Sequence, residues 1–286
     1  MLRILNFGAG VQSSCILLRS CLGELPKLDH AIFADTGDEP SYVYEWMTTA
    51  KLIAAEYGIP LHVVSRGHSL SDHLRERIPA GRRLDKIPAF TTTDKDNRYV
   101  PVLRDCTREY KIKCIDRHVK TLLGLSKVAR WPKQLEVETW IGISSDEHRR
   151  MKSSPFVWQR FWHPLIEKPW DGDSRPGWLD EPWDRQRCIR WLEERGFTGI
   201  GRSACTFCPF RSNKEWKYLK ANDPVGFAKA CDVDDLLRSG PDGVIHGMRK
   251  PLYVHRSMKP LRDEPFEDRS GQLDLWDDEC AGVCGV

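Results

Sequence analysis

The first half of the chain alternates short apolar runs with longer segments whose apolar residues recur every three or four positions. Runs of the first kind are typical of buried strands, and segments of the second kind are typical of amphipathic helices. Strands are predicted over residues 3–7, 30–34, 61–64 and 138–143, and helices over residues 12–22, 42–57 and 107–123. This alternation predicts an α/β fold with a parallel sheet and helices on both faces.

The second half of the chain, from about residue 155 onwards, has a different residue composition. Six tryptophans crowd a Pro- and Gly-rich segment and indicate an aromatic packing layer. Helices are predicted over residues 185–195, 213–220 and 224–237, whereas residues 80–105 read as a long irregular loop. The chain is therefore predicted to comprise a first domain over residues 1–152, a small, mostly helical, cysteine-rich unit over residues 153–261 and an acidic flexible tail over residues 262–286.

Length and composition narrow the class of protein. A chain of 286 residues with 40% hydrophobic residues is long enough for a substantial core. No apolar run is long enough to span a bilayer and the N-terminus has no cleavable signal pattern, so we expect a cytoplasmic protein that does not enter a membrane. In a reducing compartment, ten cysteines are more readily explained as metal ligands or reactive thiols than as disulfides. Cys15, Cys21 and Cys231 lie in apolar or helical contexts and are expected to be buried hydrophobes.

Charge is unevenly spread, although the formal net charge is only +3. Residues 66–130 hold sixteen Lys and Arg against eight Asp and Glu, whereas residues 262–280 hold eight acidic and two basic side chains. A basic stretch of this kind is typical either of a surface that faces the phosphates of a nucleotide or polynucleotide or of an ordinary solvated surface. The sequence leaves both readings open.

The N-terminal segment reads as a strand, a turn of small residues with two hydroxyls, and the start of a helix. In such an arrangement, backbone N–H groups and a helix N-terminus can hold a phosphate. The turn, Gly8-Ala-Gly-Val-Gln-Ser-Ser14, resembles the PP-loop of ATP pyrophosphatases, whose pattern is Ser-Gly-Gly-x-Asp-Ser. Gly10 and Ser13 match that pattern, and Gln12 replaces its Asp.

Two further segments resemble motifs of the sulfonucleotide reductase branch of the same family, and they follow in the same order. Ile32-Phe-Ala-Asp-Thr-Gly-Asp-Glu39 resembles its strand-end Asp-Thr-Gly-x-Glu, where Asp35 and Thr36 are suited to bind an adenosine group. Gly142-Ile-Ser-Ser-Asp-Glu-His-Arg-Arg150 resembles its Gly-Ile-Arg-x-Asp-Glu-x-x-Arg, which offers carboxylates and a guanidinium to phosphate. Three partial motifs in the right order are more specific than any one alone.

Cysteines form the next candidate site. Cys205 and Cys208 form a Cys-x-x-Cys pair followed by Pro, a spacing that lets two thiolates from one turn bind one metal centre. Cys106 and Cys188 resemble positions that accompany this pair in phosphoadenylyl-sulfate-reductase-like proteins. The resemblance implies a [4Fe–4S] cluster on these four, with Zn²⁺ as the alternative, because four thiolates suit either. Cys114 is an alternative to Cys106.

The resemblance covers roughly residues 1–260 and implies a PP-loop adenine-nucleotide domain that binds ATP and Mg²⁺. The nucleotide-binding residues implied are Gly8, Ala9, Gly10, Gln12, Ser13, Ser14, Asp35, Thr36, Gly37, Gly142, Glu147 and Arg150. The catalytic residues implied are Ser13, Asp35, Lys111, Asp146 and Cys280.

The function implied is an ATP-dependent sulfurtransferase that releases pyrophosphate and resembles the enzymes of DNA phosphorothioation and tRNA thiolation. Its expected partners are a nucleic acid (DNA or tRNA) and a sulfur donor such as a cysteine desulfurase, and an oligomer is possible. One alternative is a sulfonucleotide reductase, in which Cys280 or Cys284 on the tail attacks sulfur. The other is a non-catalytic, zinc-stabilised module that binds nucleotide or nucleic acid, which the replacement by Gln12 favours.

Overall fold

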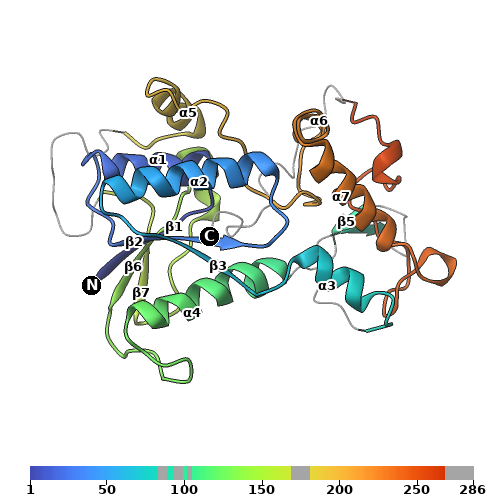
Figure 1. Ribbon diagram of the computed structural model, residues 1–286, viewed down its shortest axis with the longest axis horizontal. Coiled ribbons are helices and arrows are strands. Elements are labelled where there is room, and N and C mark those ends of the chain that lie inside the picture. The colour runs from blue at the N-terminus through green and yellow to red at the C-terminus, as the bar shows by residue number, and fades with distance from the viewer. Residues whose placement is uncertain (83–88, 93–98, 102–104, 169–180, 268–286) are drawn as a thin grey trace.

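A five-stranded parallel sheet forms the centre of the computed structural model, which describes residues 1–82, 89–92, 99–101, 105–168 and 181–267 (Figure 1). The strand order is β3-β2-β1-β6-β7, and every neighbouring pair runs parallel. A parallel sheet covered by helices confirms the predicted α/β class. The strands are β1 (Leu2–Asn6), β2 (His30–Asp35), β3 (Leu61–Ser65), β6 (Val137–Trp140) and β7 (Gln159–Trp162).

Helices cover both faces of the sheet, as the alternation of patterns predicts. Helices α1 (Val11–Cys21) and α2 (Ser41–Glu56) lie on one face, and α5 (Arg185–Glu193) packs on the outside of α1 (Figure 1). Helix α4 (Lys113–Leu122) packs against β2 and β3 on the other face. Successive strand residues point to opposite faces, so Leu5 belongs to the buried cluster under α1, whereas Ile4 belongs to the cluster under α4.

A smaller helical cluster lies beyond the carboxyl ends of the strands. Its helices are α3 (Leu70–Arg77), α6 (Asn213–Asn222) and α7 (Pro224–Leu236), and their apolar residues form a second buried core (Figure 1). Local sequence explains where the helices begin, because the side chains of Ser69, Ser212 and Asp223 each accept a hydrogen bond from a backbone N–H of the following turn.

Several short elements complete the described chain. Strands β4 (Phe90–Thr92) and β5 (Tyr99–Pro101) pair antiparallel within the segment predicted to be irregular. A π-helical turn over Thr107–Ile112 precedes α4, so the helix predicted over residues 107–123 is not α-helical throughout. Three 3₁₀ turns span Ser145–Arg150, Pro241–Gly243 and Leu261–Asp263.

The structure differs from the predicted domain plan at two places. Strand β7 lies beyond the boundary predicted after residue 152 and pairs with β6, so the sheet draws on both predicted units. The predicted tail begins as packed chain, because the Phe266 ring is 2% exposed and stacks on Trp216. The rest of that tail, residues 268–286, lies outside the described residues. Among the described helices, none combines the length and apolar character that crossing a membrane requires.

Candidate functional site

The candidate site lies beside β1, at the point where the order of the strands in the sheet reverses. The chain passes from β1 to its neighbour β2 on one side, and β6 lies on the other side. In open parallel sheets, ligands bind at the carboxyl ends of the strands beside such a switch point. The three segments with motif resemblance follow β1, β2 and β6, so the topology brings all three to this edge.

The loop after β1 leads directly into the N-terminus of α1. Ala9 adopts φ 57°, a left-handed conformation that is unusual for a residue with a side chain and that turns the chain sharply. Gly10 is the N-cap and provides no side-chain cap, and the first turn of α1 contains no acidic residue. The Ser13 hydroxyl donates to the Gly10 carbonyl oxygen at 3.1 Å. The positive end of this helix is therefore suited to an anion such as phosphate.

Ser14, which was predicted to bind nucleotide, has a different neighbour in the structure. Its hydroxyl oxygen accepts a hydrogen bond from the indole N–H of Trp46 at 2.7 Å, and the residue is fully buried. Ser14 thus joins α1 to α2 on the side facing the core. Gly8, which was also predicted to bind nucleotide, is partly buried and lies in the loop between β1 and α1.

Gln12 connects the phosphate-loop-like turn to the segment after β6. Its side-chain N–H₂ group donates to Ser144 Oγ at 3.2 Å and to Glu147 Oε2 at 3.1 Å. Its side-chain oxygen accepts from the Arg185 guanidinium at 3.4 Å. Arg150 forms an ion pair with Glu147, so the predicted carboxylate and guanidinium of the third motif do meet. One amide therefore links three segments that are far apart in the sequence.

Gly142 sits at the closest approach between these two loops. A Cβ atom added to it would lie 2.9 Å from the Ser13 backbone nitrogen and 3.2 Å from its Cα. Only a glycine lets the backbone after β6 approach the first turn of α1 this closely. Asp146, predicted as catalytic, is exposed and accepts a hydrogen bond from the Arg185 backbone N–H at 3.0 Å, which anchors the start of α5.

The segment after β2 forms a turn that several hydrogen bonds hold in place. The Asp35 carboxylate accepts from the Gly37 backbone N–H at 2.7 Å and from the Tyr44 hydroxyl at 2.8 Å. Gly37 has φ +75°, and a Cβ there would lie 2.5 Å from the Ser69 side chain, so glycine is required on both grounds. Asp35 itself remains partly exposed at the edge of the site.

A buried ion pair closes the base of the site. Lys111 Nζ lies 3.4 Å from Glu39 Oε1, with side chains 9% and 0% exposed. The Glu39 carboxylate also lies within hydrogen-bonding distance of the Thr36 and Ser203 hydroxyls, each at 3.4 Å. Burial lowers the pKa of Lys111, but the negative charges around it, that of Glu39 foremost, outweigh burial and raise the pKa above its ordinary value.

Cys205 is partly buried and lies next to this group. Its sulfur is 3.3 Å from Thr36 Oγ1, although the two residues are 169 positions apart. Burial raises the pKa of Cys205 well above its ordinary value, and Glu39 raises it further, whereas Lys111 opposes both. This environment therefore favours the thiol of Cys205 over the thiolate. The Cys-x-x-Cys turn also approaches the phosphate-loop-like turn, because a Cβ on Gly10 would lie 3.6 Å from the Ser203 nitrogen.

Three of the four predicted metal ligands lie near this end of the sheet. The Cys208 backbone N–H donates to the Cys205 carbonyl at 2.9 Å, which closes the Cys-x-x-Cys turn, and Arg211 donates to the same carbonyl at 3.1 Å. Cys106 and Cys205 both contribute to the electrostatic environment of Lys111.

Cys188 points elsewhere. It is fully buried on α5 and lies within hydrogen-bonding range of Cys15 on α1. The burial of Cys15 itself, and then its contact with Cys188, raise the pKa of Cys15. Cys15 is thus buried as expected. Across the described ranges, no three His, Cys, Asp or Glu side chains are grouped so that they could hold a metal ion. Cys280 and Cys284 lie outside the described residues.

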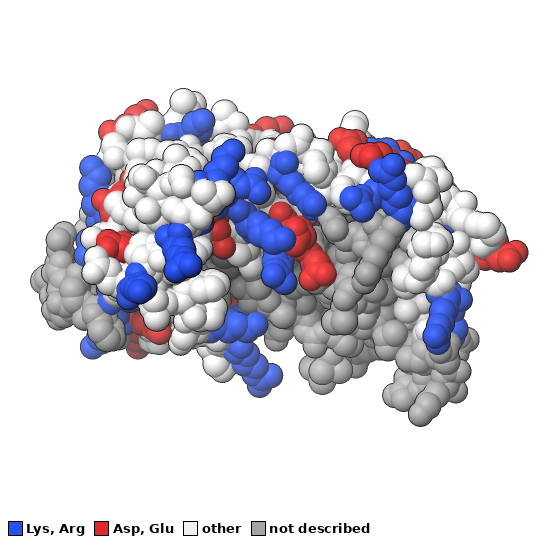
Figure 2. Space-filling model, turned by 90° about the horizontal axis from the view of Figure 1, so that it is seen from below, with Lys and Arg blue, Asp and Glu red and all other residues white. Residues whose placement is uncertain are grey.

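The basic stretch of the sequence reaches the surface around α4. Figure 2 views the molecule from below Figure 1, the side on which α4 lies, and Lys and Arg side chains adjoin one another across the middle of that face. Around α4, the side chains of Arg108, Lys113 and Arg117 are exposed, and Lys113 pairs with Glu109 at 2.6 Å. Parts of the stretch, residues 83–88, 93–98 and 102–104, are not described.

Sequence reasoning missed several residues that shape the site. Glu39 lies inside the second motif, where it matches the Glu of Asp-Thr-Gly-x-Glu, and that match is the signal that could have found it. Arg185 and Ser203 reach the site from distant segments and carry no local signal. A comparison with protein-family models, curated proteins and solved structures finds no match to this chain.

Proposed function

We propose that this protein is an ATP-dependent sulfurtransferase that adenylates an oxygen of its acceptor, releases pyrophosphate and replaces that oxygen by sulfur. The observation that carries the proposal is the meeting of the phosphate-loop-like turn, through Gln12, with Glu147 of the third motif, beside a partly buried cysteine, Cys205. An anion site and a thiol then share one edge of the sheet. We further propose that the acceptor is a nucleic acid, which the exposed cations around α4 support.

The chemistry has two steps. The acceptor oxygen attacks the α-phosphorus of ATP, and the bond from that phosphorus to the bridging oxygen breaks as pyrophosphate leaves with the electron pair. A hydrosulfide-level sulfur, released from a donor persulfide by a thiol that becomes a disulfide, then attacks the activated atom. AMP departs with the acceptor oxygen. The N-terminus of α1 stabilises the charge on the phosphates, and Mg²⁺ bound to ATP would neutralise part of it.

The [4Fe–4S] cluster stays a proposal on Cys106, Cys205 and Cys208, with Zn²⁺ as the alternative. A cluster would supply an iron that binds sulfur or a relay for electrons, and zinc would supply rigidity. The described side chains do not form a ready ligand set, and Cys188 faces Cys15, so no step is derived through either group. Assays for iron, zinc and acid-labile sulfide, on protein purified without oxygen, distinguish the cluster from zinc.

The adenylating activity is tested by its products. Purified protein is incubated with ATP, Mg²⁺, nucleic acid and sodium sulfide as the sulfur source, and the nucleotides are separated. Equal amounts of AMP and pyrophosphate are expected, and formation of ADP and phosphate, or no turnover, would contradict the proposal. Adenylyl sulfate replaces ATP in a parallel reaction, in which release of sulfite would instead favour the reductase.

The role of Cys205 is tested by a matched pair of variants. Cys205→Ser is expected to abolish transfer of radioactive sulfur to the acceptor. Cys21→Ser changes a half-buried thiol at the far end of α1, whose pKa burial raises to about 11, and it is expected to leave transfer intact. Equal transfer by the two variants would remove Cys205 from the mechanism.

A further inference from the structure

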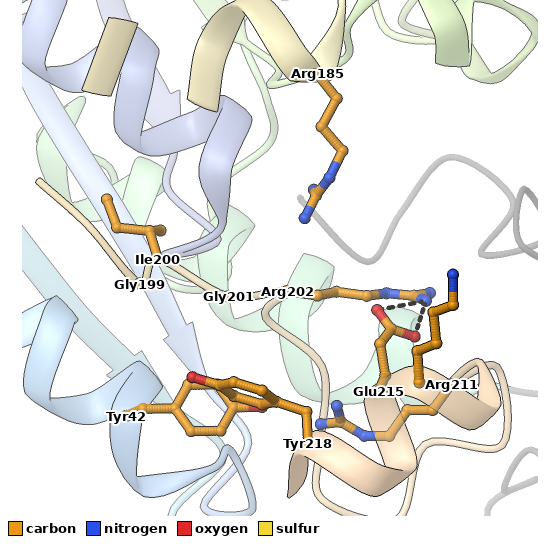
Figure 3. A pocket seen from close by; sticks show the side chains of 10 residues that line it. Tyr42, Arg185, Gly199, Ile200, Gly201, Arg202, Arg211, Glu215 and Tyr218 are labelled. Carbon is orange, nitrogen blue, oxygen red and sulfur yellow. Dashed lines mark hydrogen bonds and ion pairs between the residues drawn. The ribbon is translucent and has the colours of Figure 1, made fainter. Parts of the chain in front are cut away.

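A cationic pocket lies next to the candidate site, on the other side of a short loop. The cavity has a volume of about 350 Å³ and is lined by residues of α2, α5, α6 and the loop over residues 199–202. Four cations, Arg185, Arg202, Arg211 and Lys214, face it with one carboxylate, Glu215. In Figure 3, Arg185 extends from α5 into the open space above the loop that carries Arg202.

The cations of the pocket differ in how far they are already engaged. The Arg202 guanidinium pairs with Glu215 at 3.1 Å and donates to the Phe210 carbonyl at 2.9 Å, so the pocket's one carboxylate is largely neutralised. Arg185 donates to the neutral amide of Gln12 and forms no ion pair within the described chain. Lys214 is exposed. The pocket therefore presents a net positive charge to a ligand.

Two tyrosines give the pocket an aromatic wall. The rings of Tyr42 on α2 and Tyr218 on α6 meet edge to face, with centroids 5.5 Å apart (Figure 3). Tyr218 is 44% exposed, so part of its ring is open to a ligand. An aromatic ring beside guanidinium and ammonium groups is the combination that holds a base and a phosphate of single-stranded nucleic acid.

The pocket and the phosphate-loop-like turn are separated by one thickness of backbone. A Cβ on Gly201 would lie 3.1 Å from the Tyr42 ring, and the carbonyl oxygen of Gly201 faces Gly10 on the other side, 3.9 Å from a Cβ built there. Arg185 both lines the pocket and hydrogen-bonds Gln12. A chain held in the pocket would thus pass directly beside the nucleotide site.

We infer that this pocket binds one nucleotide unit of a single-stranded nucleic acid, its base against Tyr218 and its phosphates along Arg185 and Lys214. The inference rests on the proposed function only where it identifies the bound strand as the sulfur acceptor. Binding of the strand itself can be measured without ATP. An acidic protein segment is the less favoured occupant, since it would use the cations and leave the open ring of Tyr218 without a planar partner.

The test measures binding of fluorescent single-stranded DNA and RNA of about twelve nucleotides by anisotropy. Tyr218→Ala is expected to weaken binding about tenfold through lost base stacking. Lys214→Ala is expected to weaken it about threefold to tenfold and to reduce the salt dependence by about one phosphate contact. Lys51→Ala is the matched control, because Lys51 is exposed further along α2 and lies outside the pocket. It should bind within about twofold of the wild type.

Three results would overturn the inference. Wild-type affinity in both pocket variants would place the strand elsewhere. Equal loss of ATP affinity in Tyr218→Ala would assign the pocket to the free nucleotide. Displacement by polyglutamate at equal charge would show a general anion site. If the pocket variants lose binding but the wild type forms no AMP and pyrophosphate, the proposed function fails and the binding site stands.

Discussion

The buried pair of Lys111 and Glu39 offers the sharpest test of how the base of the site is held together. The two charges lie 3.4 Å apart with almost no solvent contact. Glu39→Gln keeps the shape of the side chain but leaves the Lys111 ammonium without its carboxylate. Removing one partner of a buried pair costs about 3–5 kcal/mol, a large part of the roughly 5–15 kcal/mol that stabilises a typical domain. Lys111→Met should cost a similar amount by stranding the carboxylate.

Urea denaturation followed by tryptophan fluorescence provides the measurement, on both single variants and the double variant. The double variant is expected to lose less stability than the two single variants lose in sum, and the difference, the coupling energy between the two residues, should be about 1–3 kcal/mol. Lys113→Met is the matched control. Its ion pair with Glu109 is shorter, at 2.6 Å, but its side chain is 49% exposed, so the loss should stay below about 1 kcal/mol.

The same pair predicts a dependence on pH. The pKa of Lys111 is raised in the folded state, so its stabilisation is complete below the ordinary lysine pKa of about 10.4 and is lost as the pH rises through the folded value. Lys111→Met should remove that alkaline loss. The reasoning is refuted if Lys111→Met costs no more than Lys113→Met, or if the single losses add within about 0.5 kcal/mol.

Three further changes test other parts of the structure. Gly142→Ala places a Cβ 2.9 Å from the Ser13 nitrogen, so calorimetry should show ATP affinity falling at least about tenfold, with an overpacking cost of about 1–3 kcal/mol in denaturation. Gln12→Glu sets a second carboxylate against Glu147 and should weaken ATP binding, whereas Gln12→Met, which only deletes the hydrogen bonds, should weaken it less. Burial and then neighbouring imidazoles lower the pKa of His62 to about 4. The free energy of unfolding should therefore fall as the pH drops from about 6.5 to 4, and it should fall less in His62→Gln. An equal fall in the wild type and in His62→Gln would contradict this.

The sheet was largely predictable because its strands are short apolar runs. Residues 31–34 are all buried and Leu61 is buried in the next strand, and the parallel order follows from the helices between the strands. Strand β7 was missed because Gln159–Trp162 is only four residues long, half of them polar, within a tryptophan-rich segment. Its place depends on pairing with β6, a long-range contact with no local pattern.

The parts of the candidate site that lie in motifs at strand ends could be predicted from the sequence. The parts that depend on which helices pack against each other could not. Topology alone brings Gln12 to Glu147, 135 residues away, once both loops are placed at one sheet edge. The direction of Cys188 does not follow from a cysteine spacing. Its neighbours Trp191 and Leu192, three and four residues on, mark the buried face of α5, and that helical period was the available sign of a core thiol.

Gln12 stands where the PP-loop pattern has an Asp, and this replacement is the main argument for a non-catalytic module. An Asp at position 12 would bring a carboxylate toward Glu147, whose charge is already paired with Arg150. Gln12 instead donates to Glu147 and accepts from Arg185, so the surrounding groups match an amide and not an acid. The departure from the PP-loop pattern is thus accompanied by its own hydrogen-bonding partners, and the first turn of α1 still contains no acidic residue. A loop that had merely lost its function would have no need of such a matched set.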